Sequence, residues 1–144
     1  MKDKFFVDSN IWIYQILKDN KKESEIKKEI SKSFLEKAGI IFISSQVLNE
    51  ISNVLIKKFE FSPEKVSSFL NEIMQSTFFI TSSPKTTFKA LEIHAKYSFS
   101  FYDSMIISSS LEAGCDCLIT EDLHQGQLIE GSLKIINPFN SEIF

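Results

Sequence analysis

Four acidic residues stand where an ordinary surface carboxylate is not expected, and the first of them is Asp8. It lies between two apolar runs, at 5–7 and 11–14, so its carboxylate is expected to be partly shielded from water. An ionised carboxylate in such surroundings is costly unless it is paired, hydrogen-bonded or bound to a metal ion. Capping the helix that follows is the structural alternative for Asp8, and Asn10 could also serve as that cap.

Glu50 borders the apolar face of a segment with helical periodicity. At about 100° per residue, Glu50 lies roughly 40° from Val54 and roughly 60° from Val47, whereas a surface acid would lie opposite this face. The structural alternative is a glutamate at the edge of the apolar stripe that reaches solvent. The residues that form the stripe are Val47, Ile51, Val54 and Leu55.

Two further acids complete the set. Asp103 shares a helical face with Ile106, Ile107 and Ser110, and its place in the first turn also suits an acid that interacts with the helix dipole. Asp122 follows the apolar run at 116–120, one residue after Glu121. Several carboxylates buried near one another would repel strongly unless a cation neutralised them.

The ligand types indicate which cation would suit such a cluster. Carboxylate oxygens without a companion histidine or cysteine favour Mg²⁺ or Mn²⁺ over zinc. Such a centre can activate a water molecule and stabilise the charge that develops on a phosphate oxygen during displacement.

Alternating strands and helices must bring these acids together. Short apolar runs predict strands at 4–8, 40–44, 77–81, 116–120 and 133–137, and helices are expected near 10–18, 23–38, 45–58, 63–76, 85–97 and 102–113. This alternation indicates an α/β fold in three layers around a mostly parallel sheet, with residues 1–144 forming one domain. Ligands of such sheets bind beyond the carboxyl ends of the strands, where Asp8, Glu121 and Asp122 would lie.

Cap signals mark several helix ends. Ser62 and Ser83 each precede a proline, which predicts an N-cap followed by proline in the first helical position. Gly39 and Gly114 each follow a helical segment and are expected to be left-handed C-caps.

Composition limits the classes of function. Apolar residues make up 43% and charged residues 24% of the 144 residues, and the net charge is −3. We find no membrane-spanning run and no signal peptide, so a cytoplasmic protein is expected. All 16 basic residues are lysines, which argues against a tight sequence-reading DNA-binding protein. Phosphate contacts would depend on lysines, backbone amides, helix N-termini or metal ions.

Other reactive side chains are better explained by structure. Cys115 and Cys117 lie in a strand-like run and are expected to be core residues. The aromatic residues around "YSFSFYD" could stack on bases, but core packing is the preferred interpretation. His94 is expected to be structural, and His124 lies near the proposed site without an assigned role.

Four segments together resemble the PIN domain, and most closely the small bacterial PIN proteins that include VapC-type toxins. The segments are "VDSNIWIY", "SSQVLNEISNVL", "FSFYDSMIISSSLEAGCDCLITEDL" and "INPF". Their ordered set covers essentially the whole chain. The resemblance implies a PIN-like fold and an endoribonuclease that hydrolyses RNA phosphodiesters with Mg²⁺ or Mn²⁺.

The resemblance also assigns site residues. Those that match the family's metal-binding acids are Asp8, Glu50, Asp103 and Asp122. Asn10 and Thr120 match polar positions that hydrogen-bond the acids or metal-bound water. Glu121 departs from the basic residue that is frequent there in toxins, and it could share or replace the role of Asp122. Without arginine, RNA backbone contacts would be left to residues such as Lys57, Lys58 and Lys96.

The resemblance further implies partners, namely an RNA substrate, a small antitoxin protein and a second copy of the chain in a homodimer. A PIN-like module that binds RNA or protein without catalysis is an alternative. An aspartate-based phosphatase or a receiver-like phosphoacceptor domain is another. The phosphatases carry a second acid where this chain has Asn10, and the receiver domains need a strand-end lysine that we do not find.

Overall fold

A central sheet of six strands organises the part of the chain that the computed structural model describes, residues 3–18 and 20–140. The strands are β1 (Lys4–Val7), β2 (Ile40–Ser44), β3 (Phe78–Ile80), β4 (Cys117–Ile119), β5 (Leu128–Ile129) and β6 (Leu133–Ile136). The helices are α1 (Ser9–Ile13), α2 (Lys22–Lys37), α3 (Ser45–Phe59), α4 (Pro63–Gln75), α5 (Pro84–Tyr97) and α6 (Phe101–Glu112).

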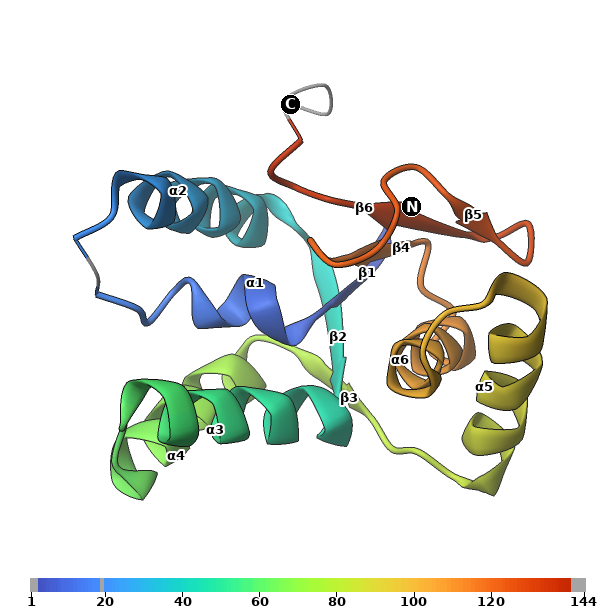
Figure 1. The fold of residues 1–144 in the computed structure, drawn as a ribbon, viewed down its shortest axis with the longest axis horizontal. Coiled ribbons are helices and arrows are strands. Elements are labelled where there is room, and N and C mark those ends of the chain that lie inside the picture. Colours follow the sequence, from blue (N-terminus) through green and yellow to red (C-terminus); the bar gives the residue numbers. More distant parts are fainter. Residues whose placement is uncertain (1–2, 19, 141–144) are drawn as a thin grey trace.

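The strand order is β3-β2-β1-β4-β6-β5, and every neighbouring pair is parallel except β5 with β6. The chain moves outward from β1 to β3 and then returns to β4. Crossovers between parallel strands are right-handed, so this reversal places the two sets of helices on opposite faces. Accordingly, α1 to α4 lie on one side of the sheet and α5 and α6 on the other (Figure 1).

The three-layer, mostly parallel α/β architecture expected from the sequence is therefore confirmed. The direction of strand connection reverses between β1 and β4, which are hydrogen-bonded neighbours in the middle of the sheet. In open α/β sheets, such a reversal leaves a crevice beyond the carboxyl ends of the two strands. Asp8 directly follows β1 and Thr120 directly follows β4, so both lie at this edge.

Apolar side chains fill both faces of the sheet. Phe6, Val7, Ile43, Leu118 and Ile119 are fully buried in the central strands. The expected stripe of α3 is also found, because Val47, Ile51 and Leu55 are buried and Val54 packs against the core.

Buried serines let α6 pack closely between α5 and the sheet (Figure 1). Ser104, Ser108 and Ser110 are fully buried on α6. The Ser108 hydroxyl donates to the carbonyl of Thr86 on α5 over 2.8 Å, and the Ser110 hydroxyl donates to Ile106 O within the helix, also over 2.8 Å. Small side chains whose hydroxyls are satisfied in this way allow helix axes to come close.

The predicted helix starts are confirmed. Ser62 caps α4 and its hydroxyl accepts a hydrogen bond from the Lys65 amide over 3.2 Å. Ser83 caps α5, and its amide donates to Thr86 Oγ1 over 3.0 Å. Each of these two helices begins with proline at its first position.

Two expected helix ends need correction, and one strand was not predicted. Gly114 has the expected left-handed φ of 71°, but α2 ends on extended Ala38 and Gly39 has no positive φ. The helix expected at 10–18 ends at Ile13, and the chain continues as turns. The two-residue strand β5 has no counterpart among the predicted strands.

None of the helices in the described residues has both the length and the apolar character needed to cross a membrane.

Candidate active site

Asp8 lies at the carboxyl end of β1, where its side chain is only 6% exposed. Its backbone amide continues the pairing with β4 by donating to Ile119 O over 2.9 Å. The carboxylate accepts the Ser9 amide over 2.8 Å and the Thr120 hydroxyl over 2.9 Å. Asp8 is therefore the N-cap of α1, and the same carboxylate also binds the end of β4.

Burial dominates the protonation of Asp8. The pKa of this carboxyl is raised from its ordinary value near 3.8 to about 7, mainly by desolvation and to a smaller extent by the negative charges of Glu50 and Asp122. Hydrogen bonds from Ser9 and Thr120 oppose the shift by favouring the charged form. Asp8 is thus close enough to Glu50 and to Asp122 to interact with each electrostatically, and the strand-end argument predicts this proximity for Asp122.

Thr120 and Asn10 connect Asp8 to Asp122. The Thr120 hydroxyl, fully buried, donates to Asp8 and accepts the Asp122 amide over 3.2 Å. The Asn10 side-chain amide donates to Asp122 Oδ2 over 2.8 Å and to Thr120 Oγ1 over 3.5 Å. Both polar residues therefore contact acids of the predicted set.

Glu50 reaches the same edge of the sheet from α3. Ser9, next to Asp8 in sequence, donates its hydroxyl hydrogen to Glu50 Oε2 over 3.0 Å. The Gln46 side-chain amide, one helical turn before Glu50, donates to Oε1 over 3.0 Å. Both oxygens of this half-buried carboxylate are hydrogen-bonded toward the site, so Glu50 is not simply a stripe-edge residue directed to solvent.

Asp103 is half-buried in the first turn of α6, and its amide donates to the hydroxyl of the N-cap Ser100 over 3.1 Å. Within residues 3–18 and 20–140, its carboxylate makes no hydrogen bond or ion pair. Its link to Glu50 is indirect. The Gln46 side-chain amide, which donates to Glu50, also donates to the backbone carbonyl of Tyr102, the residue before Asp103, over 3.0 Å.

Glu121 points to a different set of partners from Asp122. Its carboxylate accepts the Tyr14 hydroxyl over 2.6 Å and pairs with Lys27 Nζ over 2.9 Å. Burial and then the hydrogen bond to Glu121 raise the pKa of Tyr14 to about 12, while the Glu121 hydrogen bond raises the pKa of Lys27. Glu121 therefore anchors the loop after β4 to α1 and α2, and Asp122 is the acid linked to Asn10 and Thr120.

A divalent cation suits the chemistry of this edge. Among the described residues, the two buried side-chain polar atoms without a hydrogen-bond partner are Asn10 Oδ1 and Ser44 Oγ. Asn10 contacts Asp122, and Ser44 ends β2 beside β1, so both atoms belong to the carboxyl edge near Asp8. Unpaired oxygens beside a carboxyl whose pKa is raised are the donors that Mg²⁺ or Mn²⁺ would satisfy.

The acids nevertheless do not form a closed ligand cage. Within the described ranges, no group of three or more histidine, cysteine, aspartate or glutamate side chains could hold a metal ion as they lie. The structure brings Asp8 near Glu50 and Asp122, and it leaves Asp103 attached only through Tyr102. A bound cation would require these carboxylates to rearrange from the positions they have here.

Several contacts at this edge were not anticipated from the sequence. Ser9, Gln46, Tyr14 and Lys27 all hydrogen-bond an acid of the set or its neighbour Glu121. Ser9 is next to Asp8 in sequence, and Gln46 precedes Glu50 by one helical turn. The sequence spacing could therefore have indicated both residues. Nothing local links Lys27 to Glu121, which lies 94 residues away.

The remaining candidates lie elsewhere or have structural roles. Cys115 is buried and both cysteines are free, as expected of core residues. Lys96, a suggested RNA contact, instead pairs with Glu130 over 2.8 Å. His94 Nδ1 contacts the Phe99 carbonyl, and His124 is exposed in the loop after β4.

The aromatic run before α6 divides between core and surface. Tyr97 and Phe99 stack at 6.0 Å and pack against the core, whereas Tyr102 is 69% exposed. Core packing is thus confirmed for Tyr97 and Phe99, and Tyr102 is the ring of this segment that faces solvent.

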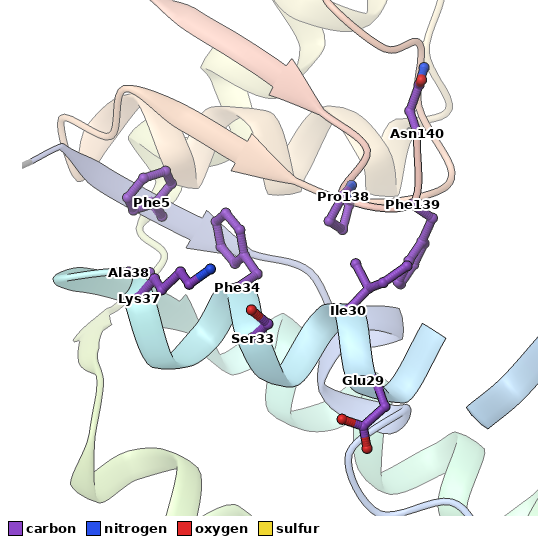
Figure 2. Close-up of a pocket in the computed structure, with 10 residues that line it drawn as sticks. All are labelled: Phe5, Glu29, Ile30, Ser33, Phe34, Lys37, Ala38, Pro138, Phe139 and Asn140. Atoms are coloured by element: carbon purple, nitrogen blue, oxygen red, sulfur yellow. The ribbon is translucent and has the colours of Figure 1, made fainter. Parts of the chain in front are cut away.

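A separate apolar cavity of about 560 Å³ lies between α2, β1 and the segment after β6. Figure 2 shows Phe5 beside Phe34, whose rings meet edge-on at 5.3 Å, and Ile30 beside Phe139. None of the four acids is among the residues that line the cavity. Phe139 also packs edge-on against Tyr14 at 5.4 Å. The cavity therefore adjoins the Tyr14–Glu121 contact but is not the acid site.

Comparison with known proteins supplies a family and several similar folds. A family model described as "PIN domain" matches residues 5–128. None of the curated proteins matches the sequence. The solved structures described next are all less than 25% identical to this chain, so they show the fold alone.

Three of these structures illustrate the similarity. A toxin–antitoxin complex from Klebsiella pneumoniae has a TM-score of 0.67 at 18% identity and covers 93% of this chain and 97% of its own. VapBC2 from Rickettsia felis, bound to a DNA fragment from its promoter, has a TM-score of 0.64 at 21% identity, with coverages of 93% and 99%. VapC20 from Mycobacterium tuberculosis, described as a toxin that cleaves the sarcin-ricin loop, has a TM-score of 0.62 at 15% identity, with coverages of 79% and 86%.

Proposed function

The chain belongs to the PIN domain family, and from this premise we propose that it is a metal-dependent endoribonuclease that hydrolyses RNA phosphodiester bonds. The observation that carries the proposal is the position of Asp8, Glu50 and Asp122. These acids interact at the carboxyl edge of the sheet, where the strand order reverses, and their proximity contributes to the raised pKa of Asp8.

The four acids have distinct parts in this proposal. Mg²⁺ or Mn²⁺, when bound, would lower the pKa of a bound water and offset negative charge on the scissile phosphate. The residues that would hold the cation are Asp8, Glu50, Asp103 and Asp122. Asn10 and Thr120 would keep Asp122 and Asp8 in place through the hydrogen bonds already present. Glu121 would remain paired with Lys27 and hold the loop.

A role as the toxin of a toxin–antitoxin pair is the finer part of the proposal. The similar structures from Klebsiella pneumoniae and Rickettsia felis are complexes of this kind, which supports a small antitoxin protein as partner. A homodimer is supported by exposed apolar side chains on β3 and α5, since Phe78 is 59% and Phe88 is 69% exposed.

We further propose that residues 1–144 form a single domain and that the protein is cytoplasmic. One hydrophobic cluster includes side chains from β1 through β6, which supports a single domain over residues 1–144. A cytoplasmic location is proposed because the RNA substrate of such a toxin is found there.

A PIN-like module that binds RNA or protein without cutting is the second candidate. The observation that favours it is the spread of the acids, since Asp103 makes no direct contact with the other three among the described residues. The phosphatase alternative is less well supported. Asn10 takes the place of the second acid of those enzymes and donates its amide hydrogen to Asp122.

The test is RNA cleavage by the purified wild-type protein, measured with Mg²⁺, with Mn²⁺ and with a chelator. Asp8→Asn and Asp103→Asn serve as the matched inactive variants. Structured transfer, ribosomal and messenger RNAs are each offered as substrate. We expect cleavage that needs the cation and falls at least 100-fold in each variant.

Two results would contradict the proposal. Cleavage that persists in Asp8→Asn would point to a contaminating nuclease. RNA binding without cleavage, in wild type and variants alike, would favour the non-catalytic module.

A further inference from the structure

Gln46 occupies an unusual place beside the proposed site. It lies in the first turn of α3, half-buried, and its side-chain nitrogen donates two hydrogen bonds. One goes to Glu50 Oε1 over 3.0 Å, and the other goes to the backbone carbonyl of Tyr102 over 3.0 Å. A side-chain amide has two N–H donors, so both are used.

This pair of bonds joins two helices that lie on opposite faces of the sheet. α3 begins directly after β2 on one face, and α6 lies on the other face (Figure 1). Across the described residues, no other hydrogen bond links α3 to α6. The hydrogen bond to Tyr102 therefore links the two helices at the carboxyl edge of the sheet. It holds α6 at the residue that precedes Asp103.

We propose that Gln46 is a positioning residue that sets the separation between the carboxylates of Glu50 and Asp103. The inference rests on the proposed function, because it concerns how the cation site is assembled. Glu50 is held through its own oxygen, and Asp103 is held through the backbone of its helix turn. One amide group thus fixes both sides of the site.

The surroundings of Asp103 make the hydrogen bond between Gln46 and Tyr102 important. The Asp103 carboxylate has no hydrogen-bond partner among the described residues, so no polar contact of the side chain itself sets its distance from α3. Its own amide is capped by Ser100, which belongs to the same turn and cannot fix the distance to α3. Gln46 supplies that missing connection.

A substitution without donors tests the inference. Gln46→Met retains the length and the helix propensity of the side chain but removes both hydrogen bonds. Gln75→Met is the matched control, because Gln75 is exposed at the end of α4. The measurements are Mn²⁺ binding by calorimetry and amide hydrogen exchange in the first turn of α6. Both are made on wild type, Gln46→Met, Asp103→Asn and the double variant.

We expect Gln46→Met to raise the Mn²⁺ dissociation constant about 5- to 10-fold, which corresponds to about 1 to 1.4 kcal/mol, a hydrogen-bond-sized loss. Exchange at the amides of Asp103 and Ser104 should accelerate several-fold. In the Asp103→Asn background, the effect of Gln46→Met on affinity should fall below 2-fold, because the acid that it positions is gone. Gln75→Met should change neither quantity.

Each other outcome overturns the inference in a recognisable way. Unchanged exchange in α6 would show that Gln46 does not hold the helix. Faster exchange with the same loss of affinity in both backgrounds would assign the effect to Glu50 alone. Absence of Mn²⁺ binding by wild type would overturn the proposed cation site itself, and the role of Gln46 in it, whatever the exchange rates show.

Discussion

The Thr120 hydroxyl donates to the Asp8 carboxylate over 2.9 Å, and this bond joins the ends of two neighbouring strands that are 112 residues apart in sequence. β1 and β4 are parallel neighbours, so residues that follow them lie side by side. The bond favours the charged form of Asp8, although burial raises its pKa to about 7. The cation-free protein therefore holds a carboxyl that titrates near neutral pH at its proposed centre.

This pKa predicts a pH-dependent stability for the cation-free protein. The folded pKa of Asp8 is about 7 and its ordinary value is near 3.8, so between these pH values the folded state binds more protons than the unfolded state. The free energy of unfolding therefore falls as pH rises from about 4 to about 7. Asp8 accounts for a decrease of roughly 4 kcal/mol at most in the free energy of unfolding, at about 1.4 kcal/mol per pKa unit.

Chemical denaturation with a chelator present, from pH 4 to pH 8.5, measures this effect. Asp8→Asn has no titrating group at this position. It should match wild type near pH 4 and be more stable by a few kcal/mol at pH 8.5. A difference between the two proteins that does not vary with pH would show that Asp8 titrates normally.

Replacing Thr120 isolates the hydroxyl group. Thr120→Val retains the shape of this fully buried side chain, but it removes the donor to Asp8 and the acceptor for the Asp122 amide. We expect a loss of about 1–3 kcal/mol at pH 8, and a further rise in the pKa of Asp8. Thermal unfolding and the pH profile of stability measure the two effects.

Thr120→Ser is the control, because it retains the hydroxyl and loses one methyl group. Its cost should be about 1 kcal/mol and should not depend on pH. Equal pH profiles for the valine and serine variants would show that the hydroxyl does not affect Asp8.

The sequence predicted the fold because the relevant signals are local. The apolar runs that became β1, β2, β4 and β6 and the helical stripe of α3 follow from periodicity within each segment. Gly39 shows the limit of such rules, since α2 ends on extended Ala38. Conversely, the non-glycine residues Glu60 and Ser98 close α3 and α5 with positive φ values of 55° and 64°. Local backbone hydrogen bonds close both helices, from Phe61 N to Leu55 O and from Ser98 N to His94 O, each over 3.0 Å, so a left-handed cap does not require glycine.

The site was predictable in part for the same reason. Asp8 and Asp122 converge because parallel strands end at one edge, which the topology alone requires. The partner of Glu121 could not be predicted, because Lys27 reaches it from α2, whose placement depends on the packing of the whole layer. The hydrogen bond from Gln46 to Tyr102 could not be predicted either. It joins residues that are 56 positions apart and belong to helices on opposite faces of the sheet.

The distinct partners of Glu121 and Asp122 predict distinct variant effects. Glu121→Gln removes the charge that pairs with Lys27 but leaves the oxygens around Asp8 in place. We expect less than a 2-fold change in Mn²⁺ affinity and a stability loss of about 1 kcal/mol, as for a partly exposed ion pair. Asp122→Asn should weaken Mn²⁺ binding at least 10-fold. Calorimetric titration of both variants measures this contrast, and the reverse order of effects would make Glu121 the fourth acid.

Cation binding should also release a proton from Asp8. A cation needs the carboxylate form, and with a pKa of about 7 Asp8 is mostly protonated at pH 6 in the cation-free protein. Binding of Mn²⁺ should therefore release close to one proton at pH 6 and almost none at pH 8.5. Calorimetry in two buffers of different ionisation enthalpy counts these protons. Between pH 7 and pH 6 the ionised fraction of Asp8 falls about 5-fold, so the apparent affinity should fall by about the same factor. Binding at pH 6 without proton release would show that Asp8 does not ligate the cation.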